Sequence, residues 1–397
     1  MLDTLGRVNP ARRTARGARF AVVLLAATAL ALSACSFGAP PADQSGTPPK
    51  RPSPSGAPSL PGVGSSAGTD AETEVLATGL PQPWAIAFLP DGSGVVTERK
   101  TGRIVKIGQP QTRSGLTVTK LASVPGIDAA GDGGLLGVAV SPHYATDKTL
   151  YVYYSTRTDN RIGAVKVGRS GVHVLVKGIP HGKIDNGGAL GFGPDGYLYA
   201  ATGDTGSKAA GAKAPSQNPK SLAGKVLRMT PAGKPAKGSS SLVYASGFRD
   251  VEGLAWDSHR HLYAVDEGAR TDNVLVVQAG RDYGWPSGES ESAPQPIQTL
   301  PAAQSTCSGI AVLDDALALA CTTGKRMWLM QITTNADVLG TPAQALANSF
   351  GRLRGVAAAP DGSLWVSTSN TDGHGTAKPQ DDHILRVVLS TVGAGVT

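Results

Sequence analysis

The sequence lacks the short motifs that identify several common kinds of site. It has no cysteine and histidine clusters at zinc-ligand spacing and no Walker loop for phosphate. No basic stripe interleaved with aromatic residues is present either, although the formal net charge is +7. Five arginines and one aspartate in the first 35 residues supply +4 of this charge, so the rest of the chain carries only +3. The charge is therefore no argument for a nucleic-acid partner.

The apolar run near the start of the chain, residues 20–32, is too short to span a bilayer well. It follows the five arginines and leads into Leu32-Ser33-Ala34-Cys35, which resembles a bacterial lipobox. We expect residues 1–35 to be a lipoprotein signal peptide, with lipid added to Cys35; an ordinary signal peptide that contains a cysteine is the alternative. The expected location is extracytoplasmic, with a lipid anchor in the cell membrane.

Residues 36–72 are rich in Pro, Gly, Ser and Ala and show no apolar periodicity. A segment of this composition has no core to bury, so we expect a disordered tether. The globular part is then residues 73–397, which is long enough for one large domain.

Cysteine is rare, with three residues in 397. Apart from Cys35, the cysteines are Cys307 and Cys321, and the midpoint between them is Asp314, in a predicted turn. Opposed positions on one hairpin bring Cβ atoms within disulfide distance, and the bond should form outside the cytoplasm. We expect a disulfide between Cys307 and Cys321, with two buried free thiols as the alternative.

What the chain does contain is a repeated unit of apolar strand, turn and second apolar strand. In its clearest copy, within residues 185–204, the turn is Pro194-Asp195-Gly196. Proline fixes φ at the first turn position, and glycine supplies the positive φ that reverses the chain. Six copies begin at residues 85, 137, 189, 253, 309 and 355, in steps of 46 to 64 residues. This period is typical of a four-stranded propeller blade, so we predict an all-β fold, a six-bladed β-propeller.

Ionisable residues stand just before several of these copies. Equivalent positions in a propeller lie around the same end of the central channel, so these side chains should converge on one mouth. Ionisable groups gathered in a pocket predict a binding site. The residues are Asp132, Asp185, Arg249, Asp250, Arg352 and Arg354.

Several longer motifs, taken together, resemble the glucose/sorbosone dehydrogenase family, and within it a divergent group of actinobacterial lipoproteins. The resemblance covers the globular part in order and implies a six-bladed propeller that oxidises aldoses with pyrroloquinoline quinone (PQQ). The motifs are residues 83–92, 97–99, 133–139, 187–204, 221–228, 283–286 and 352–354.

The resemblance also implies roles for individual residues. In the family a histidine removes the proton from the anomeric hydroxyl of the sugar, and here Asp185 stands in its place as candidate base. Arg249, kept from a His-Arg-Asn triplet, is the second candidate catalytic residue. Asp266 and Asp272 stand in a degraded form of the calcium loop of the family, which implies Ca²⁺ as a second cofactor. The implied cofactor-binding residues are Asp132, Asp250, Lys325, Arg352 and Arg354.

The replaced family residues leave three functions open. An exposed aspartate has a pKa of about 3.9, too low for a good base near neutral pH, although burial and neighbouring carboxylates raise such values. The leading prediction is a PQQ-dependent sugar (aldose) dehydrogenase-like oxidoreductase, active or with impaired catalysis, that takes a small sugar as substrate. The alternatives are a non-catalytic propeller that binds a glycan, a peptide or an envelope partner, and a calcium-dependent lactonase-type hydrolase. We expect a monomer.

Overall fold

The structure is a computed structural model that describes residues 71–389, apart from 109–115, 210 and 287–292. The chain divides into residues 1–54 and 55–397, and every described residue belongs to the second unit. The predicted signal peptide, Cys35 and almost all of the predicted tether therefore lie outside the described residues. The first strand, β1 (Ala71–Ala77), begins two residues before the expected start of the globular part. Within the described ranges, no helix is long and apolar enough to cross a membrane.

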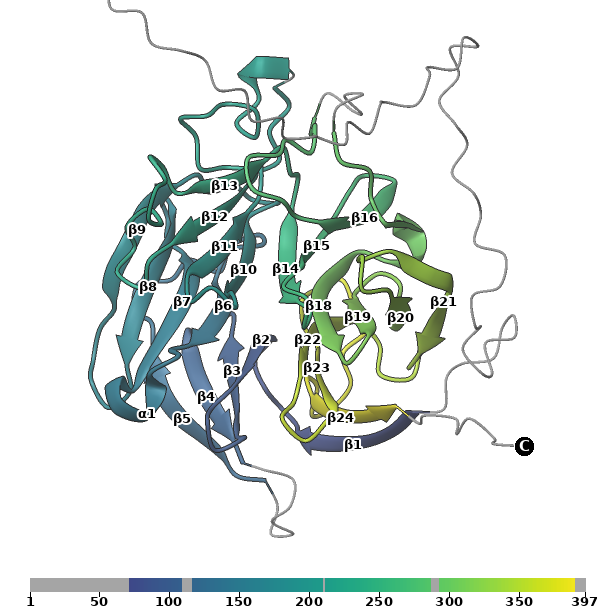
Figure 1. Cartoon of the computed structure of the whole chain (residues 1–397). Coiled ribbons are helices and arrows are strands. Elements are labelled where there is room, and N and C mark those ends of the chain that lie inside the picture. The colour runs from purple at the N-terminus through teal and green to yellow at the C-terminus, as the bar shows by residue number, and fades with distance from the viewer. Residues whose placement is uncertain (1–70, 109–115, 210, 287–292, 390–397) are drawn as a thin grey trace, which may run out of the picture. The chain divides into compact units, whose positions relative to one another are not determined.

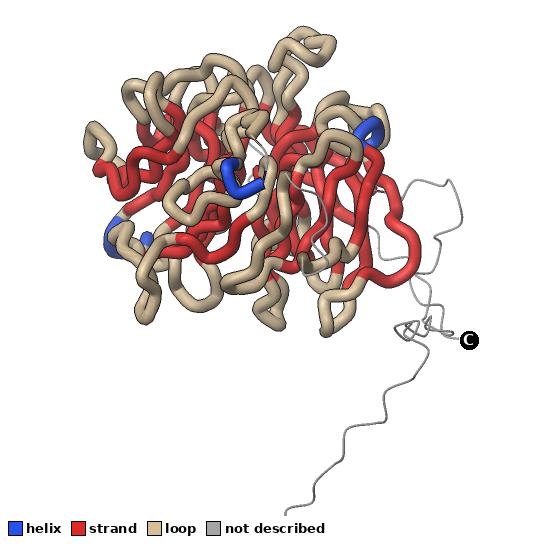
Figure 2. The backbone as a smooth tube through the Cα atoms, turned by 90° about the horizontal axis from the view of Figure 1, so that it is seen from above, coloured by secondary structure: helices blue, strands red, loops and turns tan. Residues whose placement is uncertain are grey.

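Six antiparallel sheets of four strands each form a ring, which confirms the predicted six-bladed propeller (Figure 1). Strand dominates the described part of the chain, and the helices are single short turns such as α1 (Tyr144–Asp147) (Figure 2). Blade 1 contains β2 (Pro83–Phe88), β3 (Gly94–Glu98), β4 (Arg103–Ile107) and β5 (Val118–Ser123). Blade 2 contains β6 (Leu135–Val140), β7 (Thr149–Ser155), β8 (Asn160–Lys166) and β9 (His173–Ile179). Blade 3 contains β10 (Gly187–Phe192), β11 (Leu198–Thr202), β12 (Lys225–Met229) and β13 (Val243–Ser246).

The remaining blades follow the same plan, with one exception. Blade 4 contains β14 (Val251–Trp256), β15 (Leu262–Asp266), β16 (Thr271–Val276) and β17 (Gln298–Pro301). Blade 5 contains β18 (Cys307–Leu313), β19 (Ala316–Cys321), β20 (Arg326–Ile332) and β21 (Val338–Ala345). Blade 6 contains β22 (Leu353–Ala358), β23 (Leu364–Thr368) and β24 (Ile384–Leu389), and its outer strand is β1 from the start of the domain. Because β1 pairs antiparallel with β24, the two ends of the domain close the ring by backbone hydrogen bonds.

The six sequence repeats coincide with the innermost strands, which surround the centre of the ring in Figure 1. Each repeat begins two residues after the first residue of its strand, so equivalent positions of the repeats are equivalent positions in the blades. Each innermost strand also has a register shift near its first residues. Close approach of neighbouring blades explains the glycine common at the repeat start: a Cβ on Gly355 would lie 2.4 Å from the carbonyl oxygen of Trp84.

Aromatic side chains fill the seams between blades. The rings of Phe88 and Trp365 meet edge to face at 5.2 Å between blades 1 and 6. Those of Tyr151 and Phe192 meet at 5.1 Å between blades 2 and 3. Such pairs contribute about 0.5–1.5 kcal/mol each beyond the burial of their area. These contacts therefore help to hold neighbouring blades together.

The predicted disulfide is confirmed. Cys307 and Cys321 are directly opposed on β18 and β19 and form a bond across the hairpin, whose turn contains Asp314 with a φ of 51°. The bond lies at the start of β18, so it ties the blade 5 hairpin together at the mouth of the channel.

Candidate functional site

The candidate site lies where the innermost strands begin, at one end of the central channel. The second strand of each blade runs antiparallel and ends there, so two sets of residues meet at this mouth. Asp185 and Arg249 directly precede blades 3 and 4, as predicted. Asp132, before blade 2, has an exposed side chain, whereas Asp185 and Asp250 are buried.

The loop that presents Asp185 is held rigidly. Its neighbour Asn186 accepts a hydrogen bond from the amide of Gly182 at 3.0 Å and donates one to the Gly182 carbonyl at 2.8 Å. Asp185 has a φ of 55°, a left-handed conformation that aspartate tolerates better than most residues. A Cβ at residue 203 would lie 1.9 Å from the Asp185 carbonyl oxygen, which explains Gly203. The position of the candidate base is thus fixed by its backbone.

Arg249 is the cation that faces Asp185. Its Nη2 lies 3.3 Å from Asp185 Oδ1, and its Nη1 donates to the Glu267 carbonyl at 3.0 Å. The guanidinium also lies over the Trp285 ring, 5.7 Å from its centroid, and the indole N–H of Trp285 donates to Asp204. The Glu267 carbonyl and the Trp285 ring therefore orient Arg249 toward the Asp185 carboxylate.

The environment changes the acidity of Asp185. Burial raises the pKa of Asp185 to about 6, with further increases from Asp204 and Asp132, while Arg249 opposes the shift. A carboxylate with a pKa near 6 is ionised at neutral pH and is a far stronger base than an exposed aspartate. Burial therefore gives Asp185 a pKa high enough for a general base near neutral pH.

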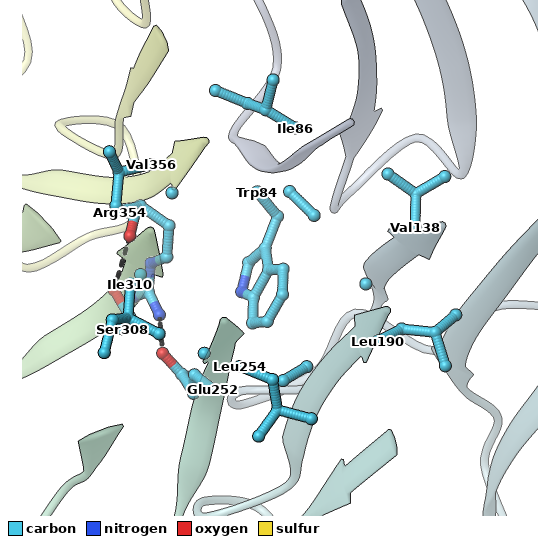
Figure 3. A pocket seen from close by; sticks show the side chains of 16 residues that line it. Trp84, Ile86, Val138, Leu190, Glu252, Leu254, Ser308, Ile310, Arg354 and Val356 are labelled. Atoms are coloured by element: carbon cyan, nitrogen blue, oxygen red, sulfur yellow. Dashed lines mark hydrogen bonds and ion pairs between the residues drawn. The ribbon is translucent and has the colours of Figure 1, made fainter. Parts of the chain in front are cut away.

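A second ion pair lines the channel below the mouth. Arg354 donates to Glu252 at 2.6 Å, and its carbonyl accepts a hydrogen bond from Ser308 at 3.0 Å (Figure 3). The indole of Trp84 lies in the same space (Figure 3). The cavity here measures about 70 Å³, enough for a few water molecules but not for a cofactor ring. A larger ligand would have to sit above it, at the mouth.

Buried carboxyl groups crowd the blade 4 side of the mouth. Burial raises the pKa of Asp266 to about 7, even though its carboxylate accepts the amides of Arg249 and Asp250. Burial and Glu252 raise the pKa of Glu267 to about 8, and burial with Glu252 and Glu267 raises that of Asp250 well above its ordinary value. Some of these carboxyl groups are therefore protonated at neutral pH, and the mouth carries fewer negative charges than it has carboxyl groups.

The cations at the mouth suit a ligand with several carboxylates. Arg352 contacts Asp372 through Nε at 2.8 Å, and Arg354 contacts Glu252 through Nη1 at 2.6 Å. Guanidinium forks bind carboxylates in two-point contacts. Lys325, predicted from blade 5, lines a cavity of about 430 Å³ together with Arg352. Arg352 and Lys325 thus offer two cations in one cavity to a ligand such as PQQ, which carries three carboxylates, while Arg354 lines the smaller cavity below.

The structure brings most of the predicted site residues into one electrostatic group. The charge of Asp132 raises the pKa values of Asp185, Glu252 and Arg354. The exposed edge of the mouth is thus coupled to the Asp185–Arg249 and Glu252–Arg354 ion pairs. The two predicted calcium ligands have other partners. Asp266 accepts backbone amides, as described, and Asp272 Oδ2 accepts the amide of Cys307 at 2.7 Å. Within the described ranges no group of three or more His, Cys, Asp or Glu is arranged to hold a metal ion, so calcium stays a prediction.

Sequence reasoning gave no role to several residues that complete the site. Glu252 is the second residue of β14, two positions after the predicted Asp250, so the same stretch of sequence could have identified it. Most of the others end the second strands of their blades or follow them closely, whereas the repeat register pointed only to positions before the first strands. They are Arg99, Asp204, Glu267, Trp285 and Asp372.

Comparison with known proteins agrees with this geometry. The profile of the Glucose / Sorbosone dehydrogenase family matches residues 80–377. The PQQ-bound form of an aldose sugar dehydrogenase from Streptomyces coelicolor superposes with a TM-score of 0.73 at 38% identity, over 81% of this chain and 99% of that one.

Two curated relatives match over part of their length. An aldose sugar dehydrogenase of Escherichia coli is 30% identical over 235 residues, which cover 54% of this chain and 61% of the relative. Quinoprotein glucose dehydrogenase B of Acinetobacter calcoaceticus is 27% identical over 252 residues, which cover 54% of this chain and 52% of the relative. The family profile spans most of the propeller, including the ion pairs of Arg249, Arg352 and Arg354, and the chain therefore belongs to the glucose/sorbosone dehydrogenase family.

Proposed function

We propose that this protein is a PQQ-dependent aldose dehydrogenase in which an aspartate performs the task of the catalytic base. The observation that carries the proposal is the pairing of Asp185, with a pKa of about 6, with Arg249 at a mouth that also presents Arg352 and Arg354. The names of the relatives agree with this assignment.

The residues of the chain divide the work as follows. PQQ, when bound, supplies a quinone that accepts the hydride equivalent from the sugar. Arg352, Arg354 and Lys325 would hold its carboxylates. The Asp185 carboxylate accepts the proton of the anomeric hydroxyl, and the Arg249 guanidinium orients that carboxylate and hydrogen-bonds the sugar. Positioning of this kind accounts for much of the rate that a protein adds to cofactor chemistry.

A direct test is calorimetric titration of PQQ into the protein from residue 36 onward, with and without Ca²⁺. We expect micromolar or tighter binding, which is lost when Arg352→Ala and Arg354→Ala are combined. The matched control is Arg169→Ala, an exposed arginine of blade 2. Undetectable binding at high protein concentration, with the control protein folded, would disprove the proposal; dependence on Ca²⁺ would support the predicted second cofactor.

One observation favours a second candidate, a propeller that binds a ligand without turnover. Arg249, Arg352 and Arg354 each already have a carboxylate partner within the protein, so the mouth is electrostatically satisfied without a cofactor. Failure to bind PQQ, together with binding of a glycan that is lost when Arg352→Ala and Arg354→Ala are combined, would select this candidate.

We also propose that the chain is anchored outside the cytoplasm by lipid on Cys35, and that the propeller is a monomer. The lipobox and the tether composition support the anchor. Incorporation of labelled palmitate that is lost in Cys35→Ala would establish the modification, and light scattering of the released domain would give its mass.

A further inference from the structure

A third cavity lies at the end of the propeller opposite the mouth. The innermost strands β10 and β14 run away from the mouth, so the turns that follow them lie at the far end. Between these turns, in the seam of blades 3 and 4, is a cavity of about 390 Å³. This volume is within the range of small-molecule sites. Nothing in the proposed reaction uses it.

The walls of this cavity are aromatic. Tyr199 is buried at the base, and its ring contacts those of Tyr244 and Trp256 edge to face at 5.3 Å each. Tyr244 and Trp256 come from different blades, and both are partly exposed to the cavity. The Tyr199 ring is also held by its hydroxyl, which donates to Asp195 at 2.9 Å. The seam thus presents three aromatic rings in fixed relation to one another.

The rim carries polar groups that have few partners in the protein. Arg260 is exposed and makes only a long contact of 3.5 Å, from Nη2 to the Pro194 carbonyl, among the described residues. His261 uses Nδ1 toward Asp257 at 2.7 Å, which leaves Nε2 for a ligand. Gln278, also exposed, completes the rim. By contrast, Arg228 has partners within the protein. Its Nη2 pairs with Asp195 Oδ2 at 2.7 Å, and its guanidinium carbon lies 4.0 Å from the centroid of the Tyr197 ring.

We infer that this cavity is a second ligand site that binds a neutral saccharide. A pyranose ring has an apolar face of C–H groups that packs on aromatic rings, and hydroxyls at its edge that need both donors and acceptors. The seam supplies Tyr244 and Trp256 for the face, and Arg260, Gln278 and His261 Nε2 for the edge. A purely apolar ligand would leave these rim groups without partners. The inference does not depend on the dehydrogenase proposal, because the site lies at the end of the ring away from the mouth.

The test is titration of maltotriose, cellotriose and triacetylchitotriose into the protein from residue 36 onward without PQQ, followed by calorimetry and by NMR. We expect at least one trisaccharide to bind below about 10 mM. Arg260→Ala and Gln278→Ala, both at exposed residues, should weaken binding about threefold to tenfold each, as loss of one or two hydrogen bonds does. Trp256→Ala should abolish it.

The controls separate this site from the mouth. Arg169→Ala changes an exposed arginine in the turn after β8, at the same end of the ring but in blade 2, and should leave binding unchanged. The Arg352→Ala, Arg354→Ala protein should also bind normally. The inference is overturned if no trisaccharide binds at this concentration, if binding survives both Arg260→Ala and Gln278→Ala without change, or if the mouth variant loses it. Should Trp256→Ala fail to fold, the two exposed variants decide the question.

Discussion

The side chains of Asp185 and Arg249 lie 3.3 Å apart, yet the pKa of Asp185 is raised to about 6 rather than lowered. Burial and the neighbouring carboxylates Asp204 and Asp132 outweigh the arginine. The pair therefore combines a base of useful strength with a cation that keeps it ionised at neutral pH. This relationship supports the proposal that Asp185 serves as the base in place of a histidine.

The first prediction concerns Asp185→Asn. Removal of the base should lower kcat for aldose oxidation by about 10²–10⁴-fold, the usual contribution of general base catalysis, with little change in PQQ affinity. The wild type should lose kcat/KM below a pH of about 6, because protonation of Asp185 removes the base. Dye-coupled kinetics from pH 4 to 9 would measure both. An unchanged rate in Asp185→Asn would refute the role of this residue.

Asp185→His is the matched variant for the same position. It restores the residue type that the family uses, so activity should be retained and the acid limb should follow the imidazole pKa, ordinarily about 6.5. Loss of activity in both variants would mean that the backbone of residues 182–186 accommodates only aspartate geometry. Thermal unfolding of each variant separates this outcome from misfolding.

The second prediction concerns the partner of the base. Arg249 lowers the pKa of Asp185, so Arg249→Met should raise it above 6 and move the acid limb of kcat/KM to higher pH. Arg249→Lys keeps the positive charge but not the guanidinium that reaches both Asp185 and the Glu267 carbonyl. Its acid limb should therefore lie between those of the wild type and Arg249→Met. An acid limb at the same pH in all three proteins would show that another group titrates.

Sequence patterns predicted the fold well because the repeat is local. Each copy combines an apolar strand with a turn, and the copies map onto the six innermost strands with one constant offset. The closure of the ring was not predicted. Residues 71–77 contain no turn signal and little apolar periodicity, and their pairing with β24 depends on how the finished ring brings the two ends together.

The site was predicted less completely, for a physical reason. The repeat register located Asp185, Arg249, Arg352 and Arg354, because equivalent positions share one end of the channel. Partner choice and acidity depend on burial and on side chains that come from other blades. Neither the contact of Arg352 with Asp372 nor the burial that sets the pKa of Asp185 can be deduced from spacing.

The third prediction concerns the bond between Cys307 and Cys321. A disulfide that closes a loop of 14 residues removes conformations from the unfolded chain, worth about 3 kcal/mol by the chain-entropy estimate. The combined Cys307→Ala and Cys321→Ala variant should lose about this much free energy of unfolding in a urea titration. Dithiothreitol should cause the same loss in the wild type and none in the variant; equal stability with and without the reductant would contradict the prediction.

The fourth prediction follows from the buried carboxyl cluster. Burial and Glu252 raise the pKa of Glu267 to about 8, above the value near 4.5 expected in the unfolded chain. The folded protein therefore holds more protons than the unfolded chain between these values, and its stability falls as the pH rises from about 5 to about 8. Asp266, with a pKa of about 7, contributes in the same direction. Glu267→Gln keeps the shape of the side chain but cannot ionise, so it should stabilise the protein by about 1–3 kcal/mol at pH 8 and by much less at pH 5. Urea midpoints measured at the two pH values give the difference in the free energy of unfolding.

The matched control is Glu72→Gln, a change to an exposed residue of the outer strand β1, which should show no such dependence on pH. If Glu267→Gln changes the free energy of unfolding equally at both pH values, Glu267 is ionised at both, and the expected rise in its pKa is wrong.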